Sequence, residues 1–106
     1  MAGYVLKIVI EDTHPPVWRR IVIPERATFA ELHEMIQIIF GWSDSHLHEF
    51  FIPSESIRIG NDEDAYLYNY FKESETLVEN FFPEHKWVRY IYDFGDEWRH
   101  KIIYEK

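Results

Sequence analysis

The sequence predicts an α+β fold in which a mostly antiparallel, twisted sheet carries one main helix packed on a face and allows a second short helix. Three observations lead to this prediction. Several short runs rich in β-branched and aromatic residues alternate as strands do. One segment has apolar residues at helical spacing between a start signal and a stop signal. Two aromatic runs flank residues 93–96, as in a β-hairpin. The 106 residues fit one domain, 1–106, of this class.

The chain begins with two predicted strands, residues 4–11 and 17–23, that pair antiparallel. Pro15 and Pro16 separate the two strands, and Pro24 ends the second strand, because proline has no backbone N–H to donate. Period-two alternation puts Trp18 and Arg20 on one face of the second strand. Arg20 can therefore stack on an aromatic ring or pair with a carboxylate on that face.

The main helix is predicted over residues 28–41. Thr28 and Glu31 have the spacing of a capping box, and Gly41 stands where a glycine often ends a helix. His33 and Gln37 lie four residues apart on a more polar flank. The apolar stripe expected to face the sheet consists of Phe29, Leu32, Ile36, Ile39 and Phe40.

A third strand over residues 46–52 and a short edge strand over 56–59 follow, with a turn or loop at 60–64. Residues 76–82 open with another capping-box spacing and are the predicted place of the second short helix. These assignments complete the middle of the chain before the final hairpin.

The last two strands, residues 87–93 and 98–105, form the hairpin. Gly95 is predicted to close its turn with a positive φ, a conformation that costs glycine no steric energy. A loop over 93–97 fixes the cross-strand register. In that register Tyr90 faces His100 and Tyr92 faces Trp98, while Arg89, Arg99 and Lys101 point to the other face.

The amino-acid composition of the chain excludes some classes of functional site and disfavours some classes of partner. The chain has no cysteine, which excludes disulfides, thiolate metal sites and cysteine catalysis. Its N-terminal apolar run is too short for a membrane span and lacks a basic leader region, so we expect no membrane partner and a cytoplasmic location. The net charge is -8, and residues 54–85 alone hold eight acids against two bases. Nucleic acid is an unfavoured partner, because binding a polyanion usually needs a basic stripe.

Two groups of polar residues are candidates for a site. His46 and His48 share one strand face, as paired metal ligands often do, and a third ligand could come from His33, His100, Asp93 or Asp96. Buried histidines also bond to backbone or hydroxyl groups, and turn aspartates bond to loop amides. This structural interpretation is favoured, so the sequence predicts no metal, no cofactor and no catalytic residue. The residues predicted to line a binding site are Trp18, Arg20, His46, His48, Asp93, Asp96, Trp98 and His100.

Five sequence blocks, in this order, resemble the plasmid pRiA4b ORF-3-like family. They are Pro15–Ile21, Leu32-His33 with Ile36-Gln37, Phe40-Gly41-Trp42, His46–Phe50 and Tyr92–His100. The resemblance runs from about Tyr4 to Tyr104, and it implies an association with plasmids and transposons without implying a mechanism. Family members often continue past the final hairpin, whereas this sequence ends at Lys106. A resolvase-like activity is not supported, because that chemistry needs a serine among arginines on a basic surface.

These observations favour a non-enzymatic binding or accessory module, linked to mobile genetic elements, that recognises a protein, peptide or small ligand through an aromatic-lined cleft. Two alternatives stay open. One is a small metal-assisted hydrolase using His46, His48 and His100, and the other is a nucleic-acid-binding accessory protein. Enzymatic activity is the less favoured interpretation, since the sequence has neither a glycine-rich phosphate loop nor a Gly-x-Ser-x-Gly motif.

Overall fold

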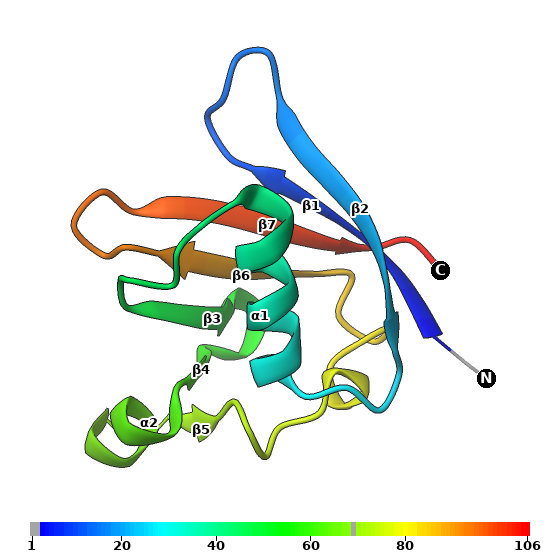
Figure 1. The fold of residues 1–106 in the computed structure, drawn as a ribbon. Coiled ribbons are helices and arrows are strands. Elements are labelled where there is room, and N and C mark those ends of the chain that lie inside the picture. The colour runs from blue at the N-terminus through cyan, green and yellow to red at the C-terminus, as the bar shows by residue number, and fades with distance from the viewer. Residues whose placement is uncertain (1–2, 69) are drawn as a thin grey trace.

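The computed structural model describes residues 3–68 and 70–106 and places a seven-stranded sheet at the centre of the fold (Figure 1). The strands are β1 (Gly3–Ile10), β2 (Val17–Pro24), β3 (His48–Ile52), β4 (Ile57–Gly60), β5 (Phe71–Lys72), β6 (Trp87–Tyr92) and β7 (Trp98–Tyr104). Their order across the sheet is β2-β1-β7-β6-β3-β4-β5, and every neighbouring pair is antiparallel except β4 with β5. The predicted α+β class is confirmed in outline, but the sheet is larger than predicted.

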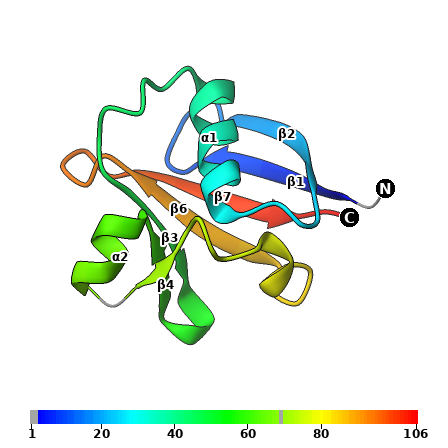
Figure 2. The ribbon, with the colours of Figure 1, turned by 60° about the horizontal axis from the view of Figure 1, so that its bottom comes forward.

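The main helix, α1 (Phe29–Phe40), packs on one face of the sheet (Figure 2). The predicted capping box is present, with the Thr28 hydroxyl accepting from the Glu31 N–H at 3.1 Å and the Glu31 carboxylate accepting from the Thr28 N–H at 3.0 Å. Gly41 ends the helix in the left-handed conformation at φ 69, as its position predicted. His33 and Gln37, expected on a polar flank, are both buried at 5% exposure. Both side chains form hydrogen bonds with the hydroxyl of Tyr90, which compensates for their burial.

The second helix is not where it was predicted. Helix α2 (Asp62–Tyr68) occupies part of the segment expected to be a loop, and residues Val78–Asn80 form only one 3₁₀ turn. The side chain of Asn61 accepts from the Asp64 N–H at 2.9 Å and so starts α2. In the expected capping position, the Thr76 hydroxyl instead donates to the carbonyl of Lys72 at 2.7 Å. A further 3₁₀ turn covers Pro53–Glu55.

Strand β4 is not an edge, because the two-residue strand β5 pairs beside it. The final hairpin has the predicted register, with Tyr90 opposite His100 and Tyr92 opposite Trp98. Its turn differs from the prediction, since positive φ values occur at Asp93 (61) and Glu97 (53) and not at Gly95. The Asp93 side chain accepts from the Gly95 N–H at 3.2 Å, a local bond that helps aspartate adopt such a conformation.

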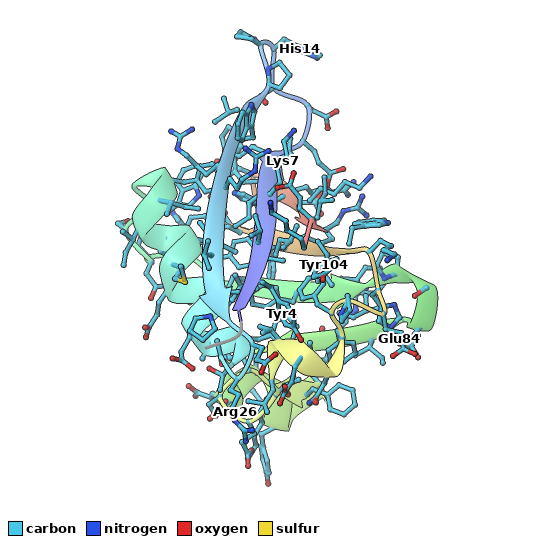
Figure 3. All side chains as sticks on the ribbon, turned by 90° about the vertical axis from the view of Figure 1, so that its right-hand side faces the viewer. Tyr4, Lys7, His14, Arg26, Glu84 and Tyr104 are labelled. Atoms are coloured by element: carbon cyan, nitrogen blue, oxygen red, sulfur yellow. The ribbon has the colours of Figure 1, made fainter. Side chains whose placement is uncertain are left out.

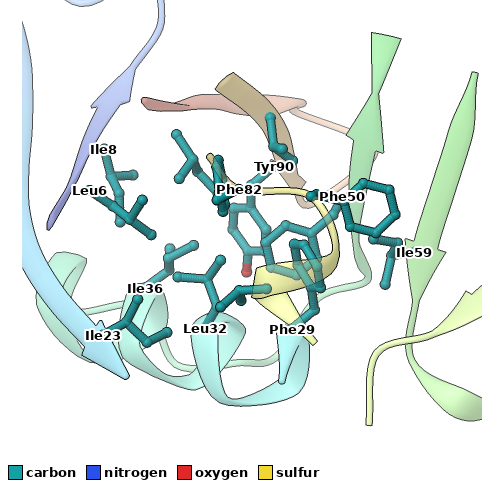
Figure 4. Packing of buried hydrophobic residues seen from close by; sticks show 14 of the residues in the cluster. Leu6, Ile8, Ile23, Phe29, Leu32, Ile36, Phe50, Ile59, Phe82 and Tyr90 are labelled. Carbon is teal, nitrogen blue, oxygen red and sulfur yellow. The ribbon is translucent and has the colours of Figure 1, made fainter. Parts of the chain in front are cut away.

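The core lies between α1 and the sheet and is rich in aromatic rings (Figure 4). Phe29 of α1 contacts Phe50 of β3 edge-on at 5.0 Å between ring centroids, and Phe50 contacts Tyr90 of β6 at 4.9 Å. Helix α1 lies to one side of β1 and β2 and leaves the other face of the sheet uncovered by this helix (Figure 3). None of the helices in the described part of the chain has the length and apolarity that a membrane span requires.

Candidate functional site

Two imidazole–carboxylate pairs lie together at one end of the core, and we call them the histidine–carboxylate cluster: His33, Asp44, His48 and Glu73. His33 comes from α1, Asp44 from the loop after it, His48 begins β3, and Glu73 follows β5. The two imidazole rings stack with centroids 3.5 Å apart and planes 8° apart. His33 Nε2 lies 2.9 Å from the Asp44 carboxylate, and His48 Nε2 lies 2.8 Å from that of Glu73.

Tyr90 lies behind the cluster and determines the tautomer of His33. Gln37 Oε1 accepts from the Asp44 N–H at 2.8 Å, so its amide nitrogen is left to donate to the Tyr90 hydroxyl at 2.8 Å. That hydroxyl then donates to His33 Nδ1 at 2.7 Å, because burial raises the pKa of Tyr90 and keeps the phenol protonated. Burial, and then the neighbouring His48, lower the pKa of His33. A neutral His33 with its proton on Nε2 fits all of these contacts.

The cluster is accessible from solvent. Its four residues line a depression of about 370 Å³ together with His46 and Asn61. The imidazoles and Glu73 are buried, whereas the Asp44 side chain is 58% exposed and stands at the mouth. A small ligand could therefore reach imidazole nitrogens and carboxylate oxygens that protein structure already holds together.

His46 was predicted to share a strand face with His48, but β3 begins at His48, so His46 lies in the loop before it. His46 and the turn residue Asp93 lie near the depression without joining the cluster. His46 is 52% exposed, and its Nε2 is 3.9 Å from the carboxylate of Asp93. The other oxygen of Asp93 accepts from the N–H groups of Gly95 and Asp96 at 3.2 and 3.5 Å. Asp93 thus bonds the loop amides, as the turn interpretation expected.

His100 lies apart from His46 and His48, so the three histidines do not converge. It is fully buried, and its Nδ1 donates to the carbonyls of Trp98 at 2.9 Å and Tyr90 at 3.3 Å. The Tyr90 ring has its centroid 5.2 Å from that of His100 and 6.0 Å from that of His48. Burial lowers the pKa of His100 to about 4, and its Nε2 has no hydrogen-bond partner among the described residues. The predicted residue Trp98 lies beside it against Trp42, with 5.7 Å between the ring centroids.

Trp18 and Arg20 lie on the face of the sheet turned away from α1, which we call the outer face. The guanidinium of Arg20 lies over the Trp18 ring at 5.0 Å and bonds the Glu105 carboxylate at 2.6 Å. Both contacts predicted as alternatives for Arg20 are therefore made. The ammonium group of Lys7 also lies over the Trp18 ring, 4.8 Å from its centroid.

A second region of the outer face is a groove of about 340 Å³, which we call the arginine groove. Its lining combines three arginines with apolar side chains and two glutamates: Arg58, Arg89, Arg99, Phe51, Ile91, Phe94, Glu49 and Glu97. Arg58 lies over Phe51, 4.4 Å from the ring centroid. Each arginine also pairs with a carboxylate, Arg58 with Glu49, Arg89 with Glu11 at 3.0 Å and Arg99 with Glu97 at 3.0 Å.

Sequence reasoning found parts of both regions. The hairpin register placed Arg89 and Arg99 on one face, and His33 was among the possible partners of His48. It missed Asp44 and Glu73, which reach the cluster from a loop and from a segment 25 residues beyond His48. Period-two alternation in β3 and β4 could have placed Phe51 and Arg58 on the outer face, but Glu73 carries no comparable signal.

Comparisons with known proteins show the family to which this chain belongs. The family model described as "Plasmid pRiA4b ORF-3-like protein" matches residues 2–106. The "Uncharacterized protein y4hQ" of Sinorhizobium fredii is 32% identical over 108 residues, which cover 95% of this chain and 52% of that protein. The crystal structure titled "Protein of Unknown Function MM3350" from Methanosarcina mazei Go1 is 38% identical with a TM-score of 0.87, over 98% of this chain and 59% of that one. The chain thus spans about half the length of the curated relative.

Proposed function

Since the chain belongs to the plasmid pRiA4b ORF-3-like family, we propose that it is a non-enzymatic binding or accessory module linked to mobile genetic elements, and that its arginine groove binds an acidic segment of a partner protein. The plasmid named in the family description supports the genetic association. A cytoplasmic location and a single-domain unit, 1–106, are parts of the same proposal. The arginine side chains of the groove supply the groups that would bind the acidic segment.

The observation that carries the proposal is that three guanidinium groups line one groove with an apolar floor on the outer face. A guanidinium has five N–H donors in a planar fork that matches a carboxylate. Arg99 uses one nitrogen on Glu97, and Arg89 uses two on Glu11, so donors remain for a second acceptor. Phe51, Ile91 and Phe94 offer apolar surface beside them. A peptide that alternates acidic and apolar side chains would satisfy both parts of this lining.

The charges favour a protein partner over a nucleic acid. Glu49 and Glu97 share the groove with the arginines. A phosphate backbone presents closely spaced negative charges along its whole length, so it would meet these carboxylates as well as the arginines. An acidic peptide can place its few carboxylates at the guanidinium groups alone.

A fluorescence-anisotropy titration tests the proposal. The probes are a labelled peptide of about ten residues that alternates Glu with Leu, its Lys–Leu counterpart, and single-stranded DNA and RNA. We expect the acidic peptide to bind and the basic peptide not to bind, with binding that weakens as salt rises. Equal binding of both peptides would contradict the proposal. Tighter binding of an oligonucleotide would replace it with the nucleic-acid alternative.

Matched variants locate the binding. Arg99→Gln should weaken binding of the acidic peptide at least tenfold, because it removes a charge-assisted hydrogen bond worth roughly 1.5–3 kcal/mol. Arg26→Gln is the control, since Arg26 is exposed and outside the groove, and it makes the same change in net charge. Equal loss of affinity in both variants would show a general charge effect and would contradict binding in the groove.

A further inference from the structure

We propose that His33, His48 and Asp44 form a binding site for a divalent transition-metal ion of the zinc class, with Glu73 as a fourth ligand. The ligand atoms of the first three residues all lie within 4.8 Å of one another. The site lies on the α1 side of the sheet, so this proposal is independent of the arginine groove.

The donor set selects the class of metal. Two imidazole nitrogens with one or two carboxylate oxygens suit zinc and neighbouring first-row metals, whereas magnesium and calcium prefer oxygen ligands alone. Two ligands at about 2.0–2.1 Å from a tetrahedral zinc are about 3.3 Å apart. Ligand atoms as far as 4.8 Å apart must therefore approach by as much as about 1.5 Å on binding. Asp44 can supply this movement, because it lies on a loop and its side chain is 58% exposed.

The two buried histidines lie side by side, and one ring must turn for both to bind a single metal ion. His33 is held by α1 and His48 by β3, and their rings are parallel with centroids 3.5 Å apart. An imidazole binds a metal through the nitrogen lone pair in its own ring plane, so two parallel rings reach one ion only after one side chain rotates. Each Nε2 faces a carboxylate oxygen, at 2.9 Å for His33 and 2.8 Å for His48. One metal ion would bind between the two pairs and not within either contact, and each Nε2 would first release any proton it carries to solvent, because only an unprotonated imidazole nitrogen binds a metal.

Metal binding at His33 would reverse the hydrogen bond between its Nδ1 and the Tyr90 hydroxyl. When Nε2 of His33 binds a metal, its Nδ1 must carry the proton and donate it to an oxygen. The Tyr90 hydroxyl is 2.7 Å from Nδ1 and can accept that proton. Gln37 holds the Tyr90 hydroxyl through its amide nitrogen and the backbone of Asp44 through its amide oxygen. One side chain therefore connects the support of the buried ligand with the exposed ligand.

The alternative is that the cluster is a closed hydrogen-bond network with no ligand. The two imidazole–carboxylate pairs satisfy one nitrogen of each ring, and that arrangement needs no metal. The open depression gives an ion a route from solvent to the imidazole nitrogens, which a metal site requires and a closed network does not.

Calorimetric titration of the chelator-treated protein with ZnCl₂, CoCl₂ and MgCl₂ tests the proposal. We expect one zinc or cobalt ion per chain to bind, with visible absorption from cobalt that reports nitrogen and oxygen ligands, and no binding of magnesium at matched concentration. Absence of zinc binding at about 100 μM metal would overturn the proposal. Magnesium binding as tight as zinc binding would also overturn it.

Three variants assign the ligands. Asp44→Asn should weaken zinc binding at least tenfold while the melting temperature in chelator stays unchanged, because Asp44 is exposed. His48→Gln should abolish binding. His46→Gln is the control, since His46 lines the depression but is outside the ligand group, and its affinity should match the wild type. Equal losses in His46→Gln and Asp44→Asn would contradict the assignment. Peptide binding in the groove should be unchanged in all three variants, so this proposal and the proposed function fail separately.

Discussion

The buried imidazole of His100 should make the protein lose stability in mild acid. Its pKa is lowered to about 4 by burial, against an ordinary value of 6.5 in the unfolded chain. Between these two values the unfolded chain binds a proton that the folded chain does not bind. Stability therefore falls as the pH decreases through this range and is fully retained above it.

The size of the effect follows from the lowered pKa. Each pH unit in this range removes about 1.4 kcal/mol, so His100 alone removes about 2 kcal/mol between pH 6.5 and pH 5 and about 3 kcal/mol by pH 4. A folded domain is stable by only about 5–15 kcal/mol, so this loss is a large share of the total. The lowered pKa of His33 adds a change of the same sign.

Urea unfolding at about pH 7 and about pH 5, followed by tryptophan fluorescence, measures this effect. We expect His100→Gln to be less stable than the wild type at pH 7 but to lose about 2 kcal/mol less on going to pH 5. His14→Gln is the control, because His14 is exposed in the loop between β1 and β2 and should leave the acid dependence unchanged. A full wild-type acid dependence in His100→Gln would refute the reasoning. An NMR titration showing His100 protonated above pH 6 would do the same.

Two further predictions concern contacts around α1. Tyr90→Phe removes the hydroxyl that bonds His33 and Gln37, so it should lower the free energy of unfolding by about 2–3 kcal/mol, measured in urea; a change below about 0.5 kcal/mol would contradict the contacts. Thr28→Ala removes one half of the capping box and should cost about 1 kcal/mol in the same assay, while Thr13→Ala, outside α1, should leave the helix content measured by circular dichroism unchanged.

Features with local signals were predicted from the sequence. The start and end of α1 follow from Thr28, Glu31 and Gly41, because the bonds that cap a helix are made within a few residues. The register of the final hairpin follows from the length of its loop, so the face that Arg89 and Arg99 share was also predictable. The positive φ values fell on aspartate and glutamate, which loop length alone does not determine.

Features made by distant segments were not predictable. Strand β5 has two residues and no periodicity, yet it places Glu73 beside His48. The burial of His33 and Gln37 depends on the Tyr90 hydroxyl, more than 50 positions away in the chain. A helical pattern of polar residues cannot show that a buried hydroxyl will face them. The sequence therefore named His48 and a possible partner in His33, but it did not indicate that Asp44 and Glu73 would lie beside them.

Mapping the peptide-binding surface by NMR tests the central claim, that the arginine groove is the binding surface of this module. The acidic peptide is titrated into isotopically labelled protein, and the shifts of the backbone amide signals are followed. We expect the largest changes in chemical shift at the backbone amides of Phe51, Arg89 and Arg99 on the outer face. Shifts confined to α1 and the loop that carries Asp44, with no change at these three residues, would contradict it.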